Sequence, residues 1–338
     1  MKADARKPRT RIGIWFALLL ALAAGLRYMT HMPGSPHVGP LPPLSGTETE
    51  LRDRLGKHVA VLAGEIGERN LWRHAALDAS ADYIESSFQA AGYRVASQHY
   101  VVHGKTVRNL EATLPGIAPS AEIVVIGAHY DSVAGSPGAN DNASGVAALL
   151  EIARLLAREQ PARSVRFVAF VNEEPPFFYT REMGSRVYAR RARARGDNIV
   201  AMLALETIGY YADAPGSQHY PFPFSPFYPD TANFVAFVGN LASRELVQVC
   251  LASFRSRATF PAEGIAAPGW MAGIHWSDHW SFWKEDYPAI MVTDTALFRY
   301  EHYHARTDTP DKIDYERLAR VVTGLAEVTR DLAGRGAE

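Results

Sequence analysis

Acidic and imidazole side chains follow three apolar runs of this 338-residue sequence, at the points where the runs end. Short continuous apolar runs are typical of strands buried on both faces, and ligands of an open parallel sheet bind beyond the carboxyl ends of its strands. Because gathered carboxylates repel one another, the pattern indicates a site for a cation. The side chains are His129 and Asp131 after residues 123–128, Glu173 and Glu174 after 165–171, and Glu206 after 199–205.

Two further segments carry chemistry of the same kind. Asp141 lies at the centre of the Gly-rich segment GANDNASG, which has neither a Walker lysine nor a GxGxxG spacing and therefore favours a cation over a phosphate. His304 provides an imidazole in a loop before the last expected helix. The one cysteine, Cys250, lies in an apolar helical pattern and can form neither an internal disulfide nor a cysteine metal cage. Any metal must therefore be held by His, Asp and Glu.

The elements that position these side chains alternate along the chain. We expect strands near 94–101, 107–113, 123–128, 165–171, 199–205 and 289–292, and helices near 47–68, 76–91, 145–158, 183–195, 230–256 and 314–333. This alternation predicts an α/β fold with a mostly parallel central sheet and helices on both faces. Residues 211–275 interrupt the rhythm with the aromatic stretch HYPFPFSPFYP. This insertion is compatible both with packing on its own aromatic side chains and with a wall of a substrate cleft.

The amino end has the composition of an export segment. A basic stretch over residues 1–11 precedes the uncharged apolar run IGIWFALLLALAAGL, so residues 1–30 are expected to be a secretion signal or a membrane anchor. The basic flank should stay inside, which places the rest of the chain outside the cytoplasm, in a periplasm or at the cell surface. Residues 31–45, rich in Pro and Gly, read as a tether to a single domain over 46–338. The net charge of −1 does not indicate nucleic acid as a partner.

Six segments occur in an order that resembles metallopeptidase family twenty-eight, the co-catalytic di-zinc aminopeptidases. They are AHYDS, GANDNASG, NEEPP, LETIGYY, SDHWSFW and YHARTDTPDKIDY, and the resemblance spans roughly residues 50–330. It implies a zinc-exopeptidase fold, peptide substrates and two zinc ions per chain.

The resemblance also implies a role for each matching residue. Asp141 would bridge the two metals, Asp131 would orient the His129 ring and Glu173 would be the general base. The family often has Asp at the position of Glu206, so this chain keeps the oxygen ligand with one more methylene. The implied ligand sets are His129, Asp141 and Glu206 for one ion, and Asp141, Glu174 and His304 for the other.

Some assignments stay open at this stage. His275 and His279 are rival ligands in the HWSDHW segment, and His302 is the nearest rival to His304. Asp278 is as compatible with a substrate contact as with a wall of the cleft. Tyr303, next to His304, is a candidate for contacting substrate.

Four functions compete. The first is an aminopeptidase that removes residues from the amino end of peptides. The second is a single-zinc acyltransferase of the same fold that cyclises amino-terminal glutamine, and the third is a binding module without metal, against which the five ligand positions and Glu173 argue. A carboxypeptidase would need a cation for the substrate carboxylate, and the sequence identifies none.

Overall fold

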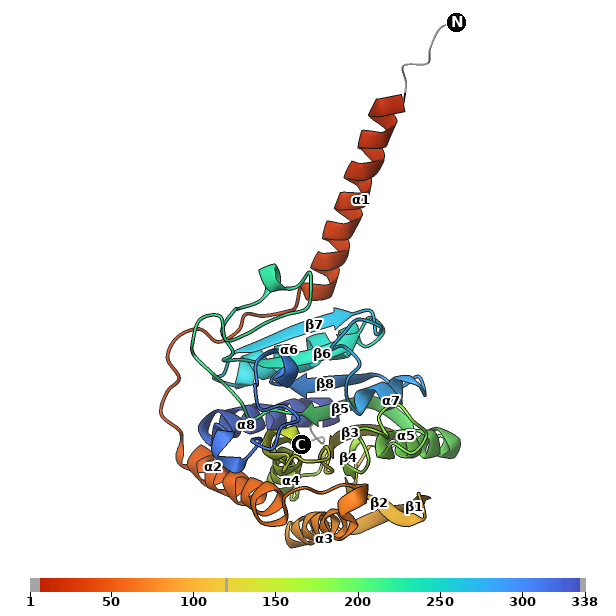
Figure 1. Ribbon diagram of the computed structural model, residues 1–338, viewed down its shortest axis with the longest axis vertical. Helices are drawn as coiled ribbons and strands as arrows, with labels where there is room; N and C mark the ends of the chain where they lie inside the picture. The colour runs from red at the N-terminus through yellow and green to blue at the C-terminus, as the bar shows by residue number, and fades with distance from the viewer. Residues whose placement is uncertain (1–6, 119–120, 335–338) are drawn as a thin grey trace, which may run out of the picture.

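A computed structural model describes residues 7–118 and 121–334 of the chain. An eight-stranded sheet in the order β1-β2-β4-β3-β5-β8-β6-β7 forms its centre (Figure 1). The strands are β1 Val95–Val102, β2 Lys105–Leu114, β3 Glu122–His129, β4 Ser164–Phe170, β5 Asn198–Glu206, β6 Val235–Asn240, β7 Ala262–Ala267 and β8 Ala289–Thr293.

The sheet is mixed, whereas the sequence led us to expect a mostly parallel one. The four central strands β4, β3, β5 and β8 run parallel, as the alternation of strands and helices predicts. β1 and β2 form an antiparallel hairpin whose β2 strand pairs with β4, and β6 runs antiparallel to β8. Antiparallel neighbours need no crossover helix between them, so the edges of the sheet depart from the parallel pattern.

Helices cover both faces of the sheet, as predicted. Two clusters of buried side chains on opposite faces explain the apolar runs, because Val124 and Ile126 of β3 enter one and Ile123 and Val125 enter the other. Helices α3 (His74–Ala90), α4 (Gly145–Leu156), α6 (Arg244–Arg257) and α8 (Tyr315–Ala333) pack on the first face, with α2 (Gly46–Val59) outside them. Helices α5 (Gly184–Arg195) and α7 (His279–Trp283) pack on the second.

Residues 211–275 extend the sheet. The single helix expected near 230–256 is wrong in its first part, because residues 235–240 form strand β6 and the helix α6 begins only at Arg244. β6 pairs in parallel with the edge strand β7, and most residues of the two strands are apolar, with Glu263 an exception in β7. Cys250 of α6 is buried against this part of the sheet, and burial raises the pKa of its thiol, in agreement with an inert core cysteine.

The amino-terminal helix α1 (Lys7–Thr30) projects from the domain beside the β7 edge (Figure 1). Within the described residues, no helix has both the length and the hydrophobicity required to cross a bilayer. The membrane anchor expected in residues 1–30 is therefore not supported here. Residues 31–45 contain no helix or strand, and Arg255 binds this segment by donating to the carbonyl of Pro33 at 2.8 Å.

Candidate metal centre

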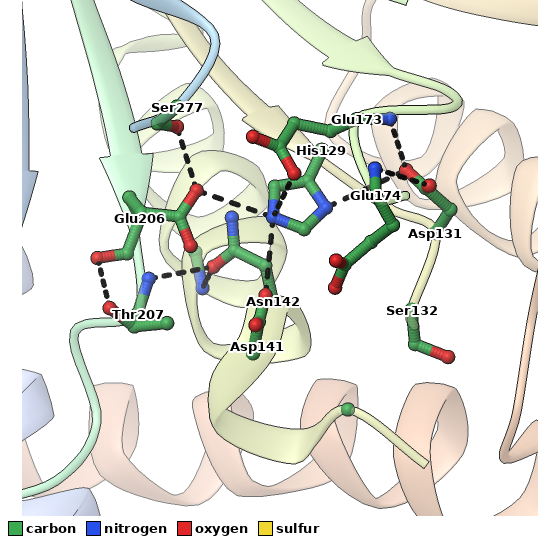
Figure 2. A network of polar contacts seen from close by, with 12 residues as sticks. His129, Asp131, Ser132, Asp141, Asn142, Glu173, Glu174, Glu206, Thr207 and Ser277 are labelled. Carbon is green, nitrogen blue, oxygen red and sulfur yellow. Dashed lines mark hydrogen bonds and ion pairs between the residues drawn. The ribbon is translucent and has the colours of Figure 1, made fainter. Parts of the chain in front are cut away.

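The side chains singled out in the sequence meet at the carboxyl ends of the parallel central strands. His129 is the last residue of β3 and Glu206 the last of β5, while Glu173 and Glu174 follow the end of β4. Figure 2 shows them converging with Asp141, which lies in the irregular turn η3 (Ala139–Ser144) between β3 and α4.

Two groups of potential ligands share Asp141. Nε2 of His129 lies 3.3 Å from Oδ1 of Asp141 and 3.3 Å from Oε2 of Glu206. Nε2 of His304 lies 3.0 Å from Oδ2 of Asp141 and 3.2 Å from Oε2 of Glu174. In each group one ligand atom per residue lies within 4.8 Å of the others, and Asp141 turns one carboxylate oxygen toward each group.

The buried polar atoms of these groups have the chemistry that divalent zinc requires. Both ring nitrogens of His129 and Oδ1 of Asp141 are buried without a hydrogen-bond partner among the described residues. Leaving such atoms unpaired is costly, and a cation held by imidazole nitrogen and carboxylate oxygen would offset the cost. The residues present therefore fit a pair of zinc ions.

The electrostatics of the centre also reflect crowding of like charges. Burial raises the pKa of Glu174 to about 8, and the neighbouring carboxylate of Asp141 adds to the effect. Burial likewise raises the pKa of Glu173 and Glu206. For His304 burial would lower the pKa, but hydrogen bonding to the carboxylates of Asp141 and Glu174 raises it to about 10. Such shifts are common where carboxylates share a buried site.

Asp131 links the ends of β3 and β4. Its two carboxylate oxygens accept the backbone N–H groups of Glu173 and Glu174, each at 3.1 Å. Its Oδ1 lies 3.5 Å from Nδ1 of His129, close to the contact expected from the sequence. The backbone turns at Asn172, directly before the two glutamates, where φ is 58° and therefore left-handed. The glutamate pair therefore lies just beyond the end of β4, as expected from its position after the apolar run.

Three features hold the loop that carries Asp141 in its conformation. Asp308 accepts the backbone N–H groups of Asn140 and Asp141, at 2.8 and 3.1 Å. Asn142 joins the loop to β5 by donating to the carbonyl of Leu205 at 2.8 Å. Gly138 has a left-handed φ of 63°, and a Cβ there would collide with the carbonyl of Asp141, so the turn requires glycine.

Arg69 supports the segment before this loop from within the core. Its side chain is fully buried, and its guanidinium donates to the carbonyls of Tyr130, Pro137 and Gly138. Residues 130–138 connect His129 to the Asp141 loop, so Arg69 fixes the path between two potential ligands.

Three supporting residues were not assigned from the sequence. Asp308 lies within the segment YHARTDTPDKIDY and Arg69 precedes all six segments, and neither side chain belongs to a ligand group. The third is Ser277, whose hydroxyl donates to Oε2 of Glu206 at 2.7 Å. It precedes Asp278 in the segment SDHWSFW, and a serine hydroxyl has no metal-ligand spacing that would single it out.

The rival ligands lie outside the two groups. His279 is fully buried and pairs through Nε2 with the carbonyl of Ile274 at 2.8 Å. The His275 ring pairs through Nδ1 with the carbonyl of Met271, and the His302 ring with the hydroxyl of Thr307.

The two candidates for substrate contact differ in position. Asp278 is buried and does not line the cavity beside the centre, so the structure does not place it against a substrate. Neither of its carboxylate oxygens has a hydrogen-bond partner among the described residues, and burial raises its pKa to about 7. Tyr303 does line the cavity, and its ring stacks on that of His304 with 3.9 Å between centroids.

An open cavity of about 290 Å³ begins at the ligand groups. Its lining includes the side chains of Asp141, Glu173, Glu174, Glu206, Tyr303 and His304, and it continues along apolar residues of the insertion. The functional interpretation of the insertion, as a wall of the cleft, therefore agrees with the structure. Buried carboxylates and an imidazole at the mouth of an apolar cavity are the features of a metal-dependent hydrolase site.

Comparison with known proteins identifies the family. The chain belongs to peptidase family M28, whose sequence profile matches residues 109–329, and it is therefore a metallopeptidase that hydrolyses peptide bonds. It is 41% identical over 283 residues to the uncharacterised protein YfbL of Escherichia coli. The matched region covers 81% of this chain and 86% of YfbL. It is also 29% identical over 207 residues to leupeptin-inactivating enzyme 1 of Streptomyces exfoliatus, of which it spans only 45%.

Solved structures share the fold at low sequence identity. A zinc aminopeptidase of Bacillus subtilis matches with a TM-score of 0.66 at 16% identity, over 85% of this chain and 96% of that one. A glutaminyl cyclase of Fimbriiglobus ruber matches with a TM-score of 0.60 at 19% identity, over 89% of this chain and 99% of that one.

Proposed function

We propose that this protein is a zinc-dependent aminopeptidase that hydrolyses the first peptide bond of its substrates. The observation that carries the proposal is the sharing of Asp141 between two ligand groups, since a carboxylate that offers one oxygen to each group can bridge a pair of ions. The zinc aminopeptidase of Bacillus subtilis and a leucine aminopeptidase of Arthroderma otae, 25% identical over 273 residues, support the same activity.

In this proposal one zinc would be held by His129, Asp141 and Glu206, and the other by Asp141, Glu174 and His304. Bound zinc would polarise the scissile carbonyl and make hydroxide available from water near neutral pH. Asp131 orients the His129 ring and holds the backbone of Glu173 and Glu174.

Glu173 is the general base of the proposed reaction. Its carboxylate faces the cavity, 3.8 Å from Nε2 of His129, while its backbone N–H is held by Asp131. It accepts the proton of the attacking water and delivers it to the leaving amine. Tyr303, whose ring lines the same part of the cavity, contacts the substrate beside the reacting carbonyl.

The charge of the cavity favours an aminopeptidase over a carboxypeptidase. Of the described residues, no lysine or arginine lines the cavity, so nothing there would neutralise a substrate carboxylate. Carboxylates surround its inner end instead, and they suit a free α-amine. The glutaminyl cyclase of Fimbriiglobus ruber has the same fold, but the fold alone does not favour cyclisation.

Metal content and product analysis test the proposal together. We expect about two zinc ions per chain, release of the first residue from peptides with a free amino end, and no release from the same peptides after amino-terminal acetylation. One zinc per chain with cyclisation of an amino-terminal glutamine would establish the cyclotransferase instead. Removal of residues from the carboxyl end would identify a carboxypeptidase.

We also propose that the catalytic domain works outside the cytoplasm, in a periplasm or at the cell surface. The basic flank and the apolar run of the amino end support this location. The side chains of Trp15, Phe16 and Leu19 in α1 are 63–67% exposed, as expected for a segment that binds something other than its own domain. Fusion of reporter proteins at residue 46 tests the location. A reporter that is active only outside the cytoplasm should give a signal, and one that is active only inside should not.

A further inference from the structure

The cavity extends from the metal centre across three more strands of the sheet. Glu206 of β5 is in register with Thr293 of β8, Thr293 with Ala236 of β6, and Ala236 with Glu263 of β7. All four residues of this row line the cavity. Neighbouring strands lie 4.7–4.9 Å apart, so the row spans roughly 14–15 Å from the ligand Glu206 to Glu263.

The floor and walls of this extension are apolar. A second row of paired residues, Met291, Val238 and Ile265, lies beside the first and also lines the cavity. The rings of Phe224, Phe234 and Phe298 complete the lining. Apolar strands and rings accept the methylene groups of a long side chain without leaving polar atoms unpaired.

A carboxylate stands at the far end of this apolar channel. Oε2 of Glu263 accepts a hydrogen bond from Arg255 at 3.2 Å, while Oε1 has no hydrogen-bond partner among the described residues. Arg255 also donates to the carbonyls of Ala262, Pro33 and Gly34, so its donors are already engaged. Arg255 and Glu263 therefore form an ion pair, and the end of the channel offers the second oxygen of Glu263 as an acceptor.

We propose that the channel binds the side chain of the amino-terminal substrate residue and that Glu263 selects a long side chain with a positive charge at its tip, lysine or arginine. This inference rests on the proposed aminopeptidase function, which places the substrate's first residue at the metal centre. The methylene stem contacts the apolar rows, and the charged tip donates to the free oxygen of Glu263. Short side chains such as alanine end before they reach β7.

Binding of amino-acid hydroxamates to the zinc-loaded protein, measured by calorimetry, tests the inference without requiring turnover. Lysine and norleucine hydroxamates have the same four-carbon side-chain stem, and only lysine carries an ammonium group at its end. We expect lysine hydroxamate to bind roughly tenfold to a hundredfold more tightly, as for a hydrogen bond to a charged group. Lysine and norleucine hydroxamates should bind about equally to Glu263→Gln. Alanine hydroxamate should bind the unaltered protein and Glu263→Gln with the same affinity.

Two further variants test whether the preference depends on Glu263 itself and whether the side chains bind along the channel. Glu245→Gln removes an exposed carboxylate of α6 and should retain the preference for lysine. Ala236→Phe places a ring in the middle of the row and should weaken both long hydroxamates while retaining the alanine compound. Equal binding of lysine and norleucine by the unaltered protein, or a preference that survives Glu263→Gln, overturns the inference.

Failure of the proposed function gives a different result. If no amino-acyl amide is hydrolysed but the lysine preference appears and depends on Glu263, the aminopeptidase proposal fails and the assignment of the channel stands. If amides are hydrolysed with norleucine preferred to lysine, the aminopeptidase stands and the role of Glu263 is wrong. If none of the three hydroxamates binds, both proposals are wrong.

Discussion

The carboxylate of Asp308 holds the backbone of Asp141 in place, by accepting its N–H at 3.1 Å while the other oxygen accepts that of Asn140 at 2.8 Å. The two aspartates are 167 residues apart in the sequence. Asp308 is not a member of either ligand group, yet it fixes the one residue that both groups share.

Replacement of Asp308 should therefore weaken metal binding from outside the ligand set. In Asp308→Ala two buried N–H groups lose their acceptor and the Asp141 loop loses its anchor, so we expect zinc affinity to fall by about 10–100-fold. Competition with a chromogenic chelator measures the affinity. Asp311→Asn, at an exposed position three residues away, is the control, and equal zinc affinity of the two variants would exclude the positioning role.

Asp141→Asn should abolish binding of at least one zinc ion. The amide keeps the size of the side chain but offers only one oxygen, so it cannot present an anionic ligand atom to each group. Elemental analysis after dialysis gives the number of ions per chain. Asp286→Asn, whose side chain is 96% exposed, should leave that number unchanged. Two ions per chain in Asp141→Asn would refute the bridging assignment.

Glu173→Gln should retain zinc and lose turnover. The amide preserves the side chain's shape but cannot accept a proton, and general acid–base catalysis typically contributes about 10²–10⁴-fold. We expect kcat to fall within that range while the zinc content equals that of the unaltered protein. Glu245→Gln is again the matched control. Retention of full activity in Glu173→Gln would remove Glu173 from the mechanism.

The buried imidazole of His279 should make the fold sensitive to acid. Burial lowers its pKa to about 4 from an ordinary value of 6.5. Between these values the unfolded chain binds a proton that the folded chain does not, so this group's contribution to the free energy of unfolding falls as the pH drops from 6.5 toward 4. Across the whole window the loss is about 3 kcal/mol.

Urea unfolding of the metal-free protein at pH 7 and pH 5 checks this contribution. His279→Gln should be less stable than the unaltered protein at pH 7 because it disturbs a buried site, but it should lose less stability between the two pH values. His99→Gln, at an exposed position of β1, should retain the full pH dependence. An identical pH dependence in His279→Gln and the unaltered protein would falsify the assignment.

Arg69→Met should destabilise the fold more than an ordinary core substitution. The methionine fills similar space but leaves the carbonyls of Tyr130, Pro137 and Gly138 without their donor. Unsatisfied buried acceptors cost about 1–3 kcal/mol each, although water can replace some of the donors. Thermal unfolding of the metal-free protein measures the loss. Arg73→Met, at an exposed position nearby, is the control, and equal melting temperatures would contradict the prediction.

The sequence by itself determined the central strands and the residue types at their ends. Runs such as residues 123–128 and 199–205 are apolar at every position because both of their faces are buried, and no other local structure accounts for them as simply. Polar side chains directly after such runs lie at the carboxyl ends of the parallel strands, so His129 and Glu206 could be predicted to meet. The ordered motifs supplied the rest of the candidate ligands through their resemblance to the family.

The tertiary structure decided what depends on partners distant in the chain. Residues 235–240 are a strand because β8 and β7 are there to pair with them, whereas local periodicity led us to expect a helix. Asp278 lies in a motif with ligand-like residues, yet packing buries it away from the cavity. The row from Glu206 to Glu263 exists only in the register of four strands, because cross-strand neighbours are set by pairing and not by sequence distance.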